Sequence, residues 1–139
     1  MMENIAKGSK INMAHKVNRP LGISVVALLM ILFGLAEVVT SFTHNFFGVS
    51  TSSVSLFTYS GATIGLFYVI AGIIVLTMKN WAAVLAIVLL IADIIGRIGL
   101  VAAGLYPLNS TEQIFAIIVG TVLAAIFAIY IGLKWKSFE

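Results

Sequence analysis

Two oppositely charged side chains stand four residues apart in a segment that is otherwise apolar. Asp93 and Arg97 lie within the apolar stretch 81–105. On a helix this spacing places both groups on the same face, one turn apart, where they can form an ion pair. Ionised side chains are costly inside a lipid bilayer and normally face the protein interior or a water-filled cavity. The pair therefore predicts a membrane-spanning segment whose middle is turned inward.

A second acid, Glu37, is expected at the depth of Arg97 on another helix. Glu37 and Arg97 follow the starts of their apolar segments, Pro20 and Trp81, by nearly the same number of residues. At about 1.5 Å per residue, both groups lie roughly 25 Å from the side where the segments begin. Asp93 lies one turn deeper, near the middle of the bilayer. We therefore predict that Arg97 is the shared partner of Asp93 and Glu37.

The charge of this set suggests its chemistry. Two acids and one base leave a formal charge of −1, and an unpaired carboxylate is costly in a low-dielectric site, so we expect one acid to stay protonated. Such an acid can carry a proton or receive a cation. Alternatively, the set is a structural ion pair that fixes helix register, with the neutral acid hydrogen-bonded nearby. If all polar faces point inward, the intramembrane polar cluster comprises Glu37, Thr40, Ser41, Thr63, Asp93, Arg97 and Thr121.

The amino-acid composition is that of an integral membrane protein. The chain has 139 residues, of which 61% are hydrophobic and 9% are charged, whereas soluble domains usually carry about 25% charged residues. Its apolar runs are long enough to span a bilayer, which takes about 20 residues. We predict an all-α, integral membrane four-helix bundle that follows a basic tail at 1–19. The predicted spans are 20–42, 56–78, 81–105 and 112–133.

The basic residues predict the orientation. They all flank one side of a four-span arrangement, except Arg97, and the opposite loops contain no Lys or Arg. These flanking residues are Lys7, Lys10, Lys16, Arg19, Lys79, Lys134 and Lys136. Under the positive-inside rule both termini are cytoplasmic, and Trp81 and Trp135 anchor that interface. Topology thus explains the pI of about 9.4 better than nucleic-acid binding does.

Small residues predict where helices pack. Gly61 and Gly65 form a GxxxG step in the second span, which lets another helix approach closely. Gly96 adds a small residue to the third span. In the fourth span small residues recur every four positions and predict a continuous ridge. They are Ala116, Gly120, Ala124, Ala128 and Gly132.

No catalytic, cofactor or metal site is expected. The chain has no cysteine, which excludes disulfides and thiolate chemistry, and its glycines do not follow a nucleotide-binding pattern. His44 and Glu37 would supply two metal ligands, whereas zinc sites usually need at least three from the protein. Asn109 begins an N-glycosylation pattern, but Ser110 and Gln113 are interpreted as a helix capping box.

Short runs of residues in this chain resemble those of two groups of small membrane proteins. The opening Arg19-Pro20-Leu21-Gly22 and the turn Lys79-Asn80-Trp81-Ala82 resemble those of small uncharacterised prokaryotic four-span membrane proteins. This resemblance implies the four-span architecture and a prokaryotic plasma membrane, but no activity. The run Leu35-Ala36-Glu37-Val38 is similar to the first span of small multidrug-resistance transporters, in which a membrane glutamate exchanges protons for cationic drug. This chain departs from the second family in having Asp93 and Arg97.

The leading functional hypothesis is a non-enzymatic structural or accessory subunit of a membrane assembly, whose partners are the lipid bilayer and copies of itself or other membrane subunits. The alternative is a small proton- or cation-coupled transporter that uses Glu37, Asp93 and Arg97.

Overall fold

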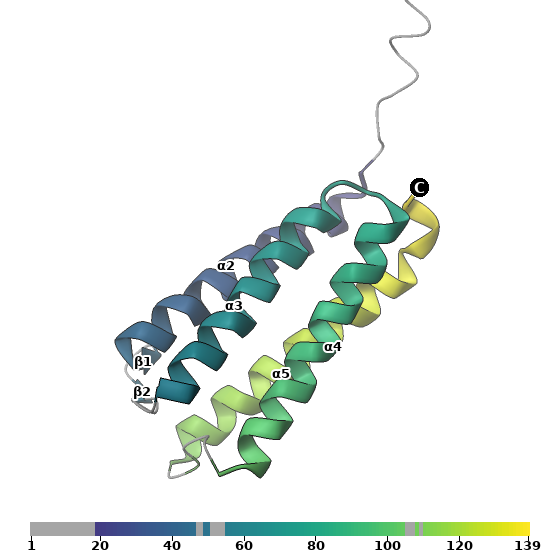
Figure 1. Cartoon of the computed structure of the whole chain (residues 1–139). Coiled ribbons are helices and arrows are strands. Elements are labelled where there is room, and N and C mark those ends of the chain that lie inside the picture. The colour runs from purple at the N-terminus through teal and green to yellow at the C-terminus, as the bar shows by residue number, and fades with distance from the viewer. Residues whose placement is uncertain (1–18, 47–48, 51–54, 105–107, 109) are drawn as a thin grey trace, which may run out of the picture.

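Four long helices make up most of the chain. The computed structural model describes residues 19–46, 49–50, 55–104, 108 and 110–139. The four helices are α2 (Leu21–Thr43), α3 (Ser55–Val75), α4 (Asn80–Ala102) and α5 (Thr111–Leu133) (Figure 1). Each is long and apolar enough to cross a membrane. The prediction of an all-α four-helix bundle is confirmed.

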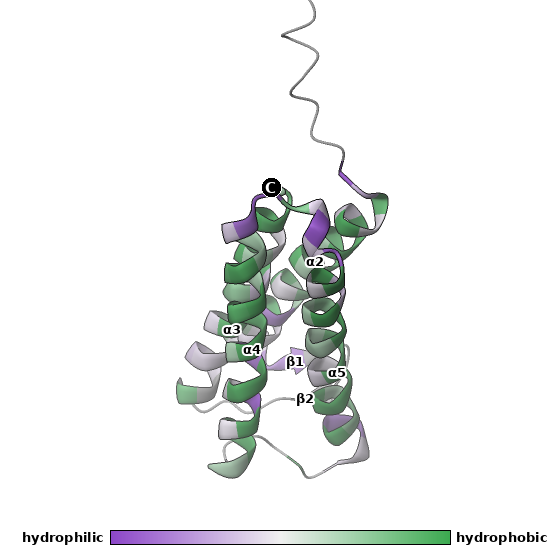
Figure 2. Ribbon diagram, turned by 90° about the vertical axis from the view of Figure 1, so that its right-hand side faces the viewer, coloured by the Kyte–Doolittle hydropathy of each residue, from purple (hydrophilic) through white to green (hydrophobic). Residues whose placement is uncertain are grey.

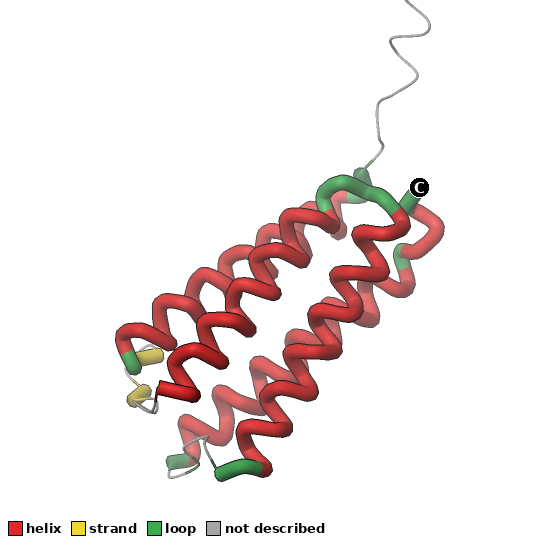
Figure 3. Tube along the Cα trace, viewed as in Figure 1, coloured by secondary structure: helices red, strands yellow, loops and turns green. Residues whose placement is uncertain are grey.

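Consecutive helices pack side by side as two hairpins, α2 with α3 and α4 with α5, and α3 packs against α4 (Figure 1). A short antiparallel ladder of β1 (Asn45–Phe46) and β2 (Val49–Ser50) follows α2. A single 3-10 turn, η1 (Trp135–Ser137), follows α5 (Figure 3). The sequence predicted a loop where the ladder forms. We call the end of the bundle at the β1–β2 ladder the hairpin end.

The α2–α3 interface depends on glycine. A Cβ atom added at Gly65 would lie 2.6 Å from the carbonyl oxygen of Gly34, and one added at Gly72 would lie 2.7 Å from that of Ala27. A Cβ at Gly61 would collide with the hydroxyl of Ser41. Because these glycines have no side chain, the two backbones approach closely. The packing role predicted for Gly61 and Gly65 is confirmed.

The predicted ridge of α5 packs only in part. Ala124 is fully buried, and Gly120 lies against the Arg97 side chain. Ala116 and Ala128 are half-buried, while Gly132 is exposed and has no atom within 4 Å of an added Cβ. The prediction of a continuous ridge is therefore wrong at Gly132. A strict four-residue repeat drifts around a 3.6-residue helix, so its last member faces outward.

Two predicted helix ends are too late in the sequence. The helix α3 ends at Val75 rather than at Met78, because residues 76–78 form a tight turn of i→i−3 hydrogen bonds and Met78 adopts φ 57°. The helix α4 ends at Ala102, two residues before Gly104, whose φ of 70° is typical of glycine that ends a helix. By contrast, Ser110 caps α5 as predicted, since its Oγ accepts a hydrogen bond from the Gln113 N–H.

The opposite end of the bundle is closed by the chain's own C-terminus. The Asn80 N–H donates to the carbonyl oxygen of Glu139 at 2.8 Å, and the Glu139 N–H donates to that of Met78 at 2.9 Å. Phe138 is buried, and the Arg19 guanidinium donates to the Leu76 carbonyl oxygen at 2.7 Å. The exposed side chains of Trp81 and Trp135 also lie here. We call this end, which carries Arg19, Lys79, Lys134 and Lys136, the basic end.

The four long helices consist mostly of hydrophobic residues along their length (Figure 2). Large hydrophobic side chains are exposed on every helix, and a monomeric soluble protein rarely exposes so much contiguous apolar surface. A lipid bilayer satisfies such a surface, and the helices leave no backbone hydrogen-bonding group of their middle turns unpaired. The core itself lies toward the basic end: the last buried apolar side chain of α4 is Leu90 and the first of α5 is Ala124.

Candidate functional site

Arg97 on α4 holds both predicted acids. Its Nη2 donates hydrogen bonds to the two carboxylate oxygens of Glu37 on α2, at 2.6 and 2.8 Å. Its Nε donates to Oδ1 of Asp93, one turn earlier on α4, at 2.9 Å. The prediction that Arg97 is their shared partner is confirmed. Since α2 and α4 pack mainly on α3 and α5 rather than on each other, the Glu37–Arg97 pair crosses the interior of the bundle.

The three charged side chains differ in their access to solvent. The Asp93 side chain is 0% exposed and that of Arg97 is 7% exposed, whereas that of Glu37 is 22% exposed. Both Asp93 and Arg97 follow the last buried apolar residue of α4, Leu90. The charged layer therefore lies next to the apolar core, on the side that faces the hairpin end. Glu37 is the member of the set that is nearest to solvent.

The helix directions explain how the side chains meet. The Cα–Cβ bond of a helical residue tilts toward the N-terminus of its helix. Asp93 on α4 therefore leans toward the basic end, where α4 begins, while Tyr68 on α3 leans toward the hairpin end, where α3 begins. The Tyr68 hydroxyl consequently comes close enough to interact with the Asp93 carboxyl group. Tyr68 is itself buried.

One carboxyl oxygen of the layer has no partner. Oδ2 of Asp93 is buried and makes no hydrogen bond to any described residue. A buried polar atom without a hydrogen bond is costly, and few are found in native proteins. By contrast, both oxygens of Glu37 accept hydrogen bonds. The two acids are therefore not equivalent: the Glu37 carboxylate is fully engaged and that of Asp93 is engaged on one side only.

Gly120 of α5 completes the layer. A Cβ added there would lie 2.8 Å from Nη1 of Arg97 and 3.2 Å from its Cζ. The missing side chain thus leaves room for the guanidinium, whose position is fixed by its hydrogen bonds to the two acids. All four long helices contribute to this charged layer, which we define as Glu37, Tyr68, Asp93, Arg97 and Gly120.

The Tyr68 ring of the charged layer packs against another aromatic ring of the core. The Phe127 ring of α5 contacts that of Tyr68 edge-on, with 6.4 Å between ring centroids, and that of Phe33 on α2 at the same separation. Edge-to-face geometry at this distance is favourable. These rings and the buried side chains of Met30 and Leu90 form the apolar surroundings of the charged layer on the side of the basic end.

Several residues of the predicted polar cluster lie elsewhere. Thr63 is exposed, and its hydroxyl donates to the carbonyl oxygen of Tyr59 at 2.8 Å, so its predicted membership is wrong. A threonine that bonds to its own helix needs no polar partner inside the bundle. Ser41 is buried but likewise donates to its own helix, at the Glu37 carbonyl oxygen. Thr121 is half-buried and has no hydrogen bond to the charged layer.

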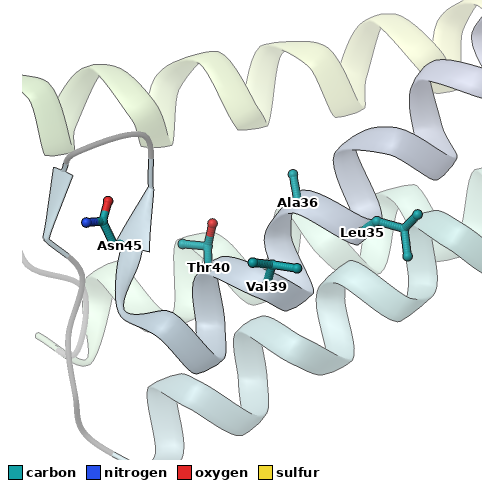
Figure 4. A pocket seen from close by; sticks show the side chains of 5 residues that line it. All are labelled: Leu35, Ala36, Val39, Thr40 and Asn45. Carbon is teal, nitrogen blue, oxygen red and sulfur yellow. The ribbon is translucent and has the colours of Figure 1, made fainter.

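Thr40 lines a shallow groove of about 270 Å³ rather than the charged layer. The groove lies along α2 and β1 and is mostly apolar (Figure 4). Its lining residues are Leu35, Ala36, Val39, Thr40 and Asn45. His44 lies beyond the end of α2, where it adopts the left-handed conformation at the C-cap. In the described part of the chain, no group of three or more His, Cys, Asp or Glu side chains is placed to hold a metal ion.

Sequence reasoning found the three charged residues but missed Tyr68, Gly34 and Phe138. Tyr68 could have been found as a phenol in the middle of an apolar span, since a buried tyrosine hydroxyl usually needs a polar neighbour. Residues 1–18 of the predicted basic tail, and Asn109, lie outside the described residues.

Comparison of the chain with protein-family models, with curated proteins and with solved structures finds no match. The two family resemblances of the sequence therefore stay predictions.

Proposed function

We propose that the protein is a non-enzymatic integral membrane protein that serves as a structural or accessory subunit of a membrane assembly, either with copies of itself or within a larger complex. We also propose that the basic end faces the cytoplasm of a prokaryotic cell. The positive-inside rule supports this orientation, because Lys and Arg determine which loops stay cytoplasmic.

The observation that carries the assembly proposal is a small-residue face on α4. Ala92, Gly99 and Ala103 are exposed and lie on one side of the helix, toward the hairpin end. No atom lies within 4 Å of a Cβ added at Gly99, whereas a Cβ added at Gly34 of α2, or at Gly65 of α3, would meet the facing helix. Small residues on a membrane helix let a second helix approach closely. The face therefore suits a transmembrane helix of a partner.

The charged layer is consistent with a structural role. The hydrogen bonds from Arg97 to the two acids connect α2 with α4 and so hold the two helical hairpins together. Helix pairs in a bilayer gain no hydrophobic energy from leaving lipid, so interhelical polar contacts and close packing decide how they associate.

The test compares two glycines that both lack neighbours within the chain. Gly99→Ile adds bulk to the proposed partner face, and Gly132→Ile adds the same bulk to an exposed position of α5 away from it. In native mass measurements on protein extracted gently from its own membrane, we expect the wild type and Gly132→Ile to be larger than a monomer. Gly99→Ile should shift toward the monomer. A monomeric wild type, or equal masses for both variants, would contradict the proposal.

A second candidate function is a small proton- or cation-coupled transporter. It is favoured by the charge of the layer, in which two acids face one base, and by the partial exposure of Glu37. Glu37→Gln should then abolish ligand-driven proton release in detergent while the helix content stays unchanged. A panel of cationic drugs and monovalent cations that gives no pH-dependent response with the wild type would exclude this function.

A further inference from the structure

The charged layer contains one negative charge too many for its position. Glu37, Asp93 and Arg97 sum to −1 when all are ionised, and the layer lies among apolar side chains in the middle of a membrane-spanning bundle. An isolated charge in such surroundings is far more costly than a neutral group. A bound cation or a proton would remove the excess charge.

A metal cation does not fit the described residues. Hard cations such as Mg²⁺ and Ca²⁺ take six or more oxygen ligands, while the only unpartnered oxygen of the layer is Oδ2 of Asp93. No cluster of three acidic, histidine or cysteine side chains is present where the structure describes the chain. The bare proton is the one cation that needs only that oxygen and one acceptor.

We propose that the charged layer is a proton-binding site, in which Asp93 carries the proton on Oδ2 and directs it toward the hydroxyl oxygen of Tyr68. Glu37 and Arg97 then remain as an ion pair. The inference goes beyond the accessory role and does not depend on it, since the proton can be detected on isolated protein.

Geometry selects Asp93 over Glu37. Glu37 accepts two hydrogen bonds from the guanidinium and is partly exposed, so its carboxylate form is well stabilised. Asp93 is 0% exposed and accepts one hydrogen bond, from Arg97 to Oδ1. Protonation of Oδ2 converts an acceptor without a partner into a donor, and the Tyr68 hydroxyl oxygen lies close to the Asp93 carboxyl group as an acceptor, so the excess charge and the unpaired atom disappear together.

Charged or polar groups of the charged layer surround Asp93. On its own helix Arg97 donates to it, and on α2 Glu37 faces it from across the guanidinium. On α3 the Tyr68 hydroxyl faces it. On α5 the nearest member of the layer is Gly120, which has no titratable group. Loss of the proton would therefore place two carboxylates around one guanidinium.

The test is infrared spectroscopy of the whole protein in lipid vesicles at neutral pH. A protonated carboxyl group gives a carbonyl stretch that shifts in heavy water and is absent from ionised carboxylates. We expect one such band in the wild type and its complete loss in Asp93→Asn. Glu37→Gln leaves Asp93 as the single acid facing Arg97 and removes the excess charge, so the band should be lost there too. The response of the band to Tyr68→Phe assigns it to Asp93 rather than to Glu37. In Tyr68→Phe the band should remain but move to higher frequency, because the hydrogen-bond acceptor is lost.

Stability provides a second measurement that separates the proposal from a purely structural role. Asn is a neutral isostere of a protonated Asp and can accept from Arg97 while donating to Tyr68, so Asp93→Asn should fold with unchanged helix content. The unfolding midpoint of the wild type should fall as the pH rises, because the folded protein then loses a proton that stabilises it. This fall should be absent in Asp93→Asn. A wild type without the band, a band that persists in Asp93→Asn, or failure of Asp93→Asn to fold would each overturn the proposal.

Discussion

Removal of the guanidinium from the charged layer should be strongly destabilising. Arg97→Met keeps an unbranched apolar side chain and eliminates the hydrogen bonds to Glu37 and Asp93, which are 2.6, 2.8 and 2.9 Å long. Breaking a buried charge set by removing one partner typically costs about 3–5 kcal/mol. Because the Glu37 side chain is 22% exposed, solvent screens part of this loss, and we expect about 3 kcal/mol.

The loss can be measured by denaturant unfolding in detergent, followed by helix circular dichroism at neutral pH. Arg19→Met is the matched control: it is the same substitution at an exposed arginine that donates to the Leu76 carbonyl oxygen. That variant should lose about 1 kcal/mol or less, the ordinary net contribution of a hydrogen bond. Lowering the pH should reduce the loss in Arg97→Met, because protonation neutralises the acid that the substitution leaves unpaired.

Paired substitutions decide which acid carries the unpaired charge. In Arg97→Met/Glu37→Gln only Asp93 remains, and if it is neutral more than half of the stability should return. In Arg97→Met/Asp93→Asn the Glu37 carboxylate remains without a partner, so little stability should return. An Arg97→Met variant no less stable than Arg19→Met would refute the reasoning that the charges hold the bundle together. Equal recovery in both paired variants would refute the assignment of the proton.

Three further predictions concern packing and topology. Gly65→Leu should lower the free energy of unfolding by about 3 kcal/mol in the same assay, the upper end of the cost of overpacking a core. The reason is that the added Cβ would lie 2.6 Å from the Gly34 carbonyl oxygen. Gly132→Leu, at a position with no neighbouring atom, should change the free energy of unfolding little. Phe138→Ala should cost about 3 kcal/mol, since Phe138 is buried under the basic end; an unfolding midpoint equal to that of the wild type would contradict this packing. In intact cells Thr111→Cys should be labelled by an impermeant thiol reagent and Lys79→Cys should not, a clean comparison because the chain has no cysteine; the reverse pattern would invert the proposed orientation.

Length and hydropathy determine the fold of this chain almost alone. A run of about 20 apolar residues has one stable conformation across a bilayer, because every backbone group must be bonded internally. The helix ends were harder to predict. The sequence from Val75 to Met78 is apolar except for Thr77 and continues the pattern of α3. Met78 nevertheless adopts a positive φ, and its carbonyl oxygen accepts a hydrogen bond from the Glu139 N–H. That contact joins distant parts of the chain, so no local pattern reports it.

In the charged layer, the depth of a residue in the membrane could be predicted from the sequence, whereas the direction in which its side chain leans depends on which way its helix runs. Counting residues from the ends of two spans that run the same way placed Glu37 level with Arg97, and the structure joins them. Counting residues in this way does not identify Tyr68, because α3 runs in the opposite direction to α2 and α4. The Tyr68 side chain therefore leans toward the hairpin end, while that of Asp93 leans toward the basic end. Two residues whose Cα atoms lie at different depths can thus meet between helices that run in opposite directions. The same geometry explains why Asp93, rather than the better-solvated Glu37, is the acid placed to hold a proton.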